Sequence, residues 1–128
     1  MAIDITWDNE AQTIIRVDFV SKWSWDDYHE MVKTITHMMN DVGHSVDIIY
    51  NLQQSAPLSA GAISHGAATL RLLDGRFGVL MIVSSAGYVK ALLSTFRTVY
   101  KKWSDCVLGA ESVEDAREII ARYATKGS

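Results

Sequence analysis

The chain has 128 residues, of which 48% are hydrophobic and 21% charged, so it can form one domain with a sizeable core and is not disordered. Its net charge of −3 gives no positive field that would attract nucleic acids, and it likewise disfavours binding to anionic membranes. The chain starts without a signal-peptide pattern, no apolar run approaches a membrane span, and the lone Cys106 cannot form an internal disulfide. We therefore expect residues 1–128 to form a single cytoplasmic domain.

The N-terminal part of the chain predicts a β-hairpin followed by a helix. Apolar and polar residues alternate from Ile3 to Trp7, and again from Ile15 to Phe19 after a short polar turn. Ser24 and Asp27 have the spacing of a capping box, so a helix should begin there. Its apolar residues recur at three- and four-residue steps, and Gly43 ends it.

The middle of the chain predicts two further strands with a helix between them. The segment from Val46 to Leu52 is rich in β-branched residues, which favours a strand, and residues 53–58 read as a loop. Ser59 can cap a helix from Ala60 to about Leu73. The uniformly apolar run from Phe77 to Val83 predicts the middle strand of a parallel sheet, covered on both faces.

The last third of the chain adds a helix, a short strand and a final helix. The helix is expected from Ala86 to Trp103 and the strand from Cys106 to Ala110. Ser112 starts the final helix as its cap, and Tyr123 is expected on its buried face. The order ββαβαβαβα predicts an α/β fold: a mixed, mostly parallel five-stranded sheet with about four helices and right-handed crossovers.

The motifs of common enzymes and metal sites are missing from the sequence. None of the histidines His29, His37, His44 and His65 has a partner at the i, i+4 spacing of a helical metal site, so we expect no metal. No glycine-rich phosphate loop follows a strand, and no Gly-x-Ser-x-Gly nucleophile motif occurs. We therefore expect no cofactor and no enzymatic activity.

Polar residues follow two of the predicted parallel strands, where open sheets place their binding sites. The candidate residues for binding a partner or ligand are Asn51, Gln53, Gln54 and Ser55 after the third strand and Ser84 and Ser85 after the fourth. The alternative is that these residues only form turns and caps.

The layout of the chain resembles the STAS domain of anti-sigma-factor antagonists, of the SpoIIAA-like kind. The similarity covers nearly the whole chain and rests on the hairpin with Ile14–Phe19, the helix after it and the strand Val46–Leu52. It implies a non-enzymatic signalling domain that binds a protein, with an anti-sigma-factor-like kinase as the expected partner. In that family a serine at the start of the next helix is phosphorylated. Ser59 is the matching candidate phosphoacceptor, although Leu58 stands where the family has aspartate.

Two other functions remain open from the sequence. The same broad fold occurs in domains that resemble lipid carriers, which predicts a small apolar, lipid-like ligand between the first helix and the sheet. The methionines Met31, Met38 and Met39 suit such a pocket, and they suit core packing equally well. A third hypothesis is a homo-oligomer that forms through helix faces carrying Trp25 or Trp103.

Overall fold

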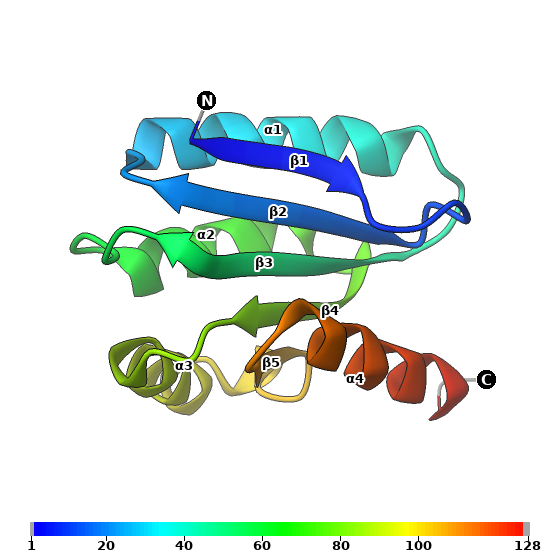
Figure 1. The fold of residues 1–128 in the computed structure, drawn as a ribbon. Helices are drawn as coiled ribbons and strands as arrows, with labels where there is room; N and C mark the ends of the chain where they lie inside the picture. Colours follow the sequence, from blue (N-terminus) through cyan, green and yellow to red (C-terminus); the bar gives the residue numbers. More distant parts are fainter. Residues whose placement is uncertain (1, 127–128) are drawn as a thin grey trace.

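The computed structural model describes residues 2–126, which form a five-stranded sheet with helices on both faces (Figure 1). The strands are β1 (Ile3–Trp7), β2 (Ile14–Ser21), β3 (Val46–Ser55), β4 (Phe77–Val83) and β5 (Val107–Ala110). The helices are α1 (Trp25–Asn40), α2 (Ala62–Leu73), α3 (Gly87–Val99) and α4 (Val113–Lys126), with a short 3₁₀ helix η1 (Lys101–Trp103). The order ββαβαβαβα and the mixed α/β class are confirmed.

The strands lie in chain order across the sheet, from β1 to β5. β1 is antiparallel to β2, with Ile5 opposite Val17, and the other neighbouring strands are parallel. The prediction that Phe77–Val83 is the middle strand is wrong, because both hairpin strands lie on the same side of β3 and this makes β3 the middle strand. The other half of that prediction is confirmed, since apolar clusters cover both faces of β4.

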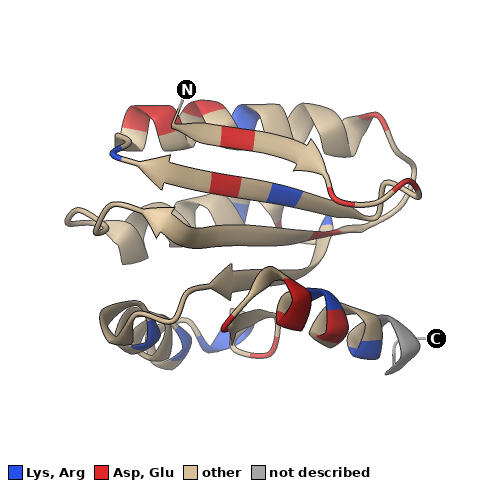
Figure 2. Cartoon of the chain, in the orientation of Figure 1, with Lys and Arg blue, Asp and Glu red and all other residues tan. Residues whose placement is uncertain are grey.

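Three helices cover one face of the sheet and α4 packs on the other (Figure 1). Each crossover from β2 to β5 steps in the same direction, so right-handed connections put α1, α2 and α3 on the same side. The last helix connects no strands and is free to cover the second face, where Ile49, Met81 and Val83 lie fully buried. Figure 2 shows acidic and basic residues along β1, β2 and α4.

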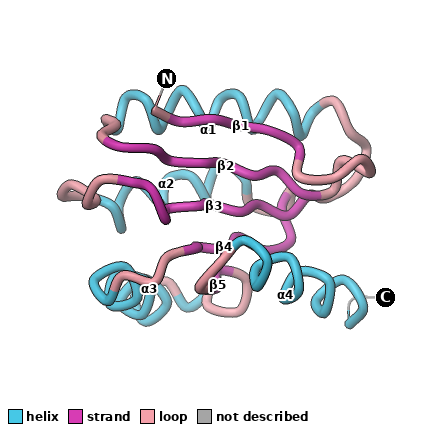
Figure 3. Tube along the Cα trace, viewed as in Figure 1, coloured by secondary structure: helices cyan, strands magenta, loops and turns pink. Residues whose placement is uncertain are grey.

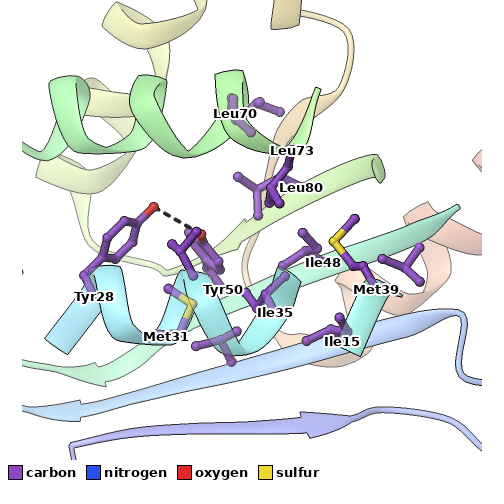
Figure 4. Packing of buried hydrophobic residues seen from close by; sticks show 14 of the residues in the cluster. Ile15, Tyr28, Met31, Ile35, Met39, Ile48, Tyr50, Leu70, Leu73 and Leu80 are labelled. Atoms are coloured by element: carbon purple, nitrogen blue, oxygen red, sulfur yellow. Dashed lines mark hydrogen bonds between the residues drawn. The ribbon is translucent and has the colours of Figure 1, made fainter. Parts of the chain in front are cut away.

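The larger core lies between the sheet and the first three helices (Figure 4). Ile15, Ile35, Ile48 and Leu70 are at most 1% exposed, and burial of each such side chain contributes about 1.5–3 kcal/mol. Along β2 every second residue points into this core, as the alternation in the sequence predicts. None of the helices in the described range is long and apolar enough to span a bilayer.

Helix starts follow the capping residues at two of the three predicted positions. The Ser24 hydroxyl accepts a hydrogen bond from the Asp27 amide, and the Asp27 carboxylate accepts one from the Ser24 amide, both at 3.0 Å, so the capping box is confirmed. The Ser112 hydroxyl likewise accepts a hydrogen bond at the start of α4. The predicted cap at Ser59 is wrong, because the helix begins two residues later, after Gly61 in the left-handed region at φ 95°.

Two further expectations about the helices are corrected. The long helix predicted to reach Trp103 stops at Val99, because the chain turns at Tyr100 before η1 and thereby brings Trp103 into the core at 5% exposure. Tyr123, expected on the buried face of the last helix, is 41% exposed. Ile120, one turn earlier, still packs in the second core cluster.

Candidate functional site

Residues 53–58 are predicted to form a loop after the third strand, but the first half of this segment belongs to the strand itself. β3 continues to Ser55, and Gln54 and Ser55 pair with the last residues of β2. The polar side chains of Gln53 and Gln54 gave no sign of this pairing, because the partner strand is supplied by residues more than thirty positions earlier. The prediction of a loop over residues 53–58 is therefore wrong up to Ser55.

Most candidate side chains on β3 bind to the protein itself. The Asn51 amide donates to the Asp18 carboxylate at 2.9 Å, and the Gln53 amide donates to the Glu111 carbonyl at 3.2 Å. The Ser55 hydroxyl donates to the next carbonyl in the chain at 2.7 Å. These bonds hold the carboxyl end of β3 in place, which is the structural alternative that the sequence left open.

The two predicted binding segments do lie side by side, at the carboxyl ends of the parallel strands (Figure 3). The Leu58 amide donates to the Tyr88 hydroxyl at 3.1 Å and so joins the loop before α2 to the start of α3. Ser84 is buried, and its hydroxyl accepts from the Ala86 amide at 3.1 Å, so it serves the turn. Ser85 is exposed.

Ser59 is exposed in the loop between β3 and α2. It borders a hollow of about 480 Å³ together with Lys22 and Asp27, which come from the loop before α1 and from its first turn. The serine therefore lies near one cationic and one acidic side chain at the surface, and it does not cap a helix.

An apolar pocket of about 110 Å³ lies between α2, α3 and the sheet. Its walls come from the first turn of α1, from most of the length of α2 and α3, and from the strands β2 to β5. It reaches toward the carboxyl ends of the strands at Leu52 of β3 and Ile82 of β4. All of the lining residues are apolar or aromatic, and none carries a charge. Open parallel sheets place their ligand sites at this end, because the loops there leave room above the strands.

Small residues of α2 make the space for this pocket. Ala62 and Gly66, one turn apart, lie on the face of α2 that lines it, opposite Phe96 of α3. A Cβ atom at Gly66 would meet only the Phe96 ring, at 3.8 Å. Larger side chains at these two positions would fill part of the pocket.

Aromatic rings form the wall on the side of α1. Trp23 lies 5.0 Å from both Phe19 and Trp25, measured between ring centroids, and Tyr28 lies 5.3 Å from Trp25 in an edge-to-face arrangement. The Trp25 indole donates to the Ala60 carbonyl at 3.0 Å, which fixes the loop before α2 against α1. Such packed rings have few accessible rotamers, so this wall is preorganised.

Three hydroxyl groups meet beside the pocket. The hydroxyls of Tyr28 and Tyr50 are 3.1 Å apart (Figure 4), and the Thr69 hydroxyl lies 2.8 Å from that of Tyr28. Burial raises the pKa of Tyr28, and it raises the pKa of Tyr50 well above its usual value. Both phenols are therefore neutral at physiological pH.

His29 of α1 and His65 of α2 form a hydrogen bond between their ring nitrogens at 2.8 Å. The ring centroids are 5.0 Å apart, and the two ring planes are tilted by 53°. The pair joins α1 to α2 by a hydrogen bond, and the described residues contain no group of three or more side chains placed to hold a metal ion.

The pocket is not where the sequence analysis expected it. Met31 and Met39 are buried in the core below α1, and no methionine lines the pocket. The signal in the sequence was instead the pair of small residues Ala62 and Gly66 at one face of a predicted helix. Sequence alone could not distinguish a small residue that leaves space from one that lets a helix approach the sheet.

The tryptophans offer little surface for a homo-oligomer. Trp103 lies in the core at 5% exposure, and Trp25 is half-buried, with its ring stacked on His65 at a centroid distance of 4.2 Å. Within the described residues, Leu72 and Val99 are the most exposed large apolar side chains.

Comparisons with protein-family models and with curated proteins found no match for this chain.

Proposed function

We propose that this protein binds a small apolar molecule in the pocket between α2, α3 and the sheet. The observation that carries the proposal is a cavity of about 110 Å³ whose lining is almost entirely apolar, at the carboxyl ends of the parallel strands. Protein interiors are close-packed and leave few voids larger than a water molecule. Apolar cavities on the order of 150 Å³ stay dry and accept molecules the size of benzene.

The residues around the pocket support ligand binding rather than catalysis. The lining contains no group that could act as a nucleophile or base at neutral pH, since Tyr28 and Tyr50 are held neutral by burial. Its aromatic wall is already packed before a ligand enters, so binding costs little ordering. The protein then acts as a carrier or sensor of the ligand.

The first test is mass spectrometry of protein desolvated gently after purification from its native lysate. A constant additional mass is expected on the wild-type protein. Ala62→Leu, which puts a larger side chain at the pocket wall, should lower the occupied fraction at least several-fold. Ala68→Leu is the matched control, because Ala68 is exposed on the same helix and should leave occupancy unchanged. A bare mass in several preparations would contradict the proposal.

A second candidate is the STAS-like function in which the chain binds a regulatory protein in the cytoplasm and phosphorylation of Ser59 switches the binding. The specific support is the exposure of Ser59 in a loop beside the carboxyl ends of β3 and β4. A phosphate there would add about two negative charges near Lys22 and Asp27 at a surface open to a partner kinase.

Partner capture tests the second candidate. Tagged protein is used to recover partners from its native lysate, and the recovered chain is mapped for phosphate. The hypothesis expects a stoichiometric partner that is lost with Ser59→Glu and kept with Ser59→Ala, together with phosphate on Ser59. Equal capture by both variants would rule out the switch.

A further inference from the structure

Among the described residues, the three hydroxyl groups beside the pocket leave one hydrogen-bonding position, either a proton or a lone pair, without a partner. The Thr69 hydroxyl lies 2.8 Å from the Tyr28 hydroxyl and 3.0 Å from the His65 carbonyl, but it has a single proton to donate. Tyr28 in turn lies 3.1 Å from Tyr50. The Tyr50 hydroxyl, at the end of this row, has Tyr28 as its one hydrogen-bond partner among the described residues.

The hydroxyls can donate along the row in either direction, and in both cases the position without a partner is on Tyr50. When Thr69 donates to Tyr28, Tyr28 donates to Tyr50, and the Tyr50 proton has no acceptor. When Thr69 donates to the His65 carbonyl, Tyr28 donates to Thr69 and Tyr50 to Tyr28, and the lone pairs of Tyr50 remain open. Tyr50 is 6% exposed and lines the pocket, so bulk water does not satisfy it freely.

From this arrangement we infer that the ligand is a neutral, ring-sized molecule with one hydroxyl or carbonyl group, which hydrogen-bonds to the Tyr50 hydroxyl while its apolar body fills the pocket. The inference rests on the proposed ligand-binding function and names the chemical class of the ligand. The volume of about 110 Å³ sets the size at one ring with few substituents.

The same lining disfavours a charged ligand. A carboxylate or ammonium group in the pocket would lose its hydration, and no oppositely charged side chain lines the walls to compensate. One neutral polar group matches the single open valence at Tyr50. A ligand with several polar groups would leave the others without partners against aliphatic side chains such as Leu70 and Leu80.

The inference is tested with phenol and toluene as probes, which have similar size and differ in the hydroxyl group. Binding to the whole protein is followed by NMR titration, with the shifted resonances mapped to the pocket. Tyr50→Phe should weaken phenol binding about fivefold, the effect of one hydrogen bond, and leave toluene binding within a factor of two. Tyr123→Phe, on the exposed part of α4, is the control and should change neither affinity.

A second measurement uses the wild-type protein and does not depend on the variant folding. With ¹³C at the hydroxyl-bearing ring carbon of tyrosine, phenol should shift the Tyr50 signal and toluene should shift it much less. Equal responses to the two probes, or equal losses of both in Tyr50→Phe, would overturn the inference while the pocket stands as an apolar site. If neither probe binds the wild-type protein, the proposed function is itself wrong.

Discussion

The Asp8 carboxylate accepts two hydrogen bonds from the Arg117 guanidinium, at 2.7 and 2.8 Å, across 109 positions of the chain. Asp8 follows β1, and Arg117 lies on α4, so the pair attaches the last helix to the hairpin. The Arg16 guanidinium donates to the same carboxylate at 2.8 Å. The Asp8 side chain is 2% exposed, so this carboxylate is well shielded from water, although Arg117 is 44% exposed.

Asp8→Asn is expected to destabilise the protein by about 1–2 kcal/mol at pH 7, because charge-assisted hydrogen bonds to two arginines are lost. The hydrogen bonds from Arg117, with the nearby charges, lower the pKa of Asp8 below its usual value. The contribution to stability is therefore complete above the unfolded pKa near 4 and is lost as the pH falls through the folded pKa.

Urea unfolding at pH 7 and at about pH 3 measures this pH dependence. The difference between wild type and Asp8→Asn should shrink at the lower pH, because about pH 3 lies below the unfolded pKa near 4 and the unfolded wild-type chain then takes up a proton at Asp8. Asp4→Asn, on the exposed side of β1, is the control and should cost less than about 0.5 kcal/mol. A pH-independent difference would show that the ion pairs do not contribute.

Gly66→Ala is expected to stabilise the protein by about 0.5–1 kcal/mol, because alanine loses less backbone entropy in a helix than glycine. Gly66 lies inside α2, and the added Cβ would meet the Phe96 ring at an ordinary contact distance of 3.8 Å. Thermal unfolding gives the change in stability. A loss of stability would mean that the space beside Gly66 is smaller than the structure indicates.

Gly78→Ala is expected to destabilise the protein, since its Cβ would collide with the Asp47 carboxylate. That carboxylate accepts a hydrogen bond from the Val79 amide at 2.9 Å, and moving it aside should cost about 1 kcal/mol. In an Asp47→Ala background the same glycine substitution should cost much less, because the obstacle is gone. Equal costs in a double-mutant cycle would rule out this contact as the cause.

Tyr28 and Tyr50 are expected to remain protonated at a pH where exposed tyrosines ionise. Burial raises both pKa values in the folded protein, so the unfolded chain releases these protons first as the pH rises. Their contribution to stability is therefore complete below pH 10, the usual tyrosine pKa, and declines above it.

Ultraviolet absorbance of ionised tyrosine follows this titration. The chain has five tyrosines, and two of them should ionise only together with unfolding, which far-ultraviolet circular dichroism monitors. Tyr50→Phe should halve the absorbance change that accompanies unfolding at high pH. Tyr123→Phe should instead reduce the change that occurs at lower pH, where exposed tyrosines ionise. A single early phase with the fold intact would contradict the burial of these phenols.

Local patterns in the sequence were enough to predict the element order and the face of most elements. The alternation along Ile14–Phe19 placed Ile15 and Val17 in the core, and the capping box at Ser24 gave the start of α1. These signals work because they depend on residues within a few positions of one another. The same reasoning failed at Ser59, where the conformation of Gly61 and the packing of Trp25 on the loop decide where α2 begins.

The sequence by itself determined the α/β class and the order of strands and helices, because side-chain periodicity and caps are local properties. Only the tertiary structure decided that β3 extends through Gln53 and Gln54, and that a pocket opens beside Gly66. It also decided that His29 and His65 form a pair and that Tyr28, Tyr50 and Thr69 form one row of hydroxyls. Each of these features joins residues from separate elements, so it depends on how the helices settle on the sheet.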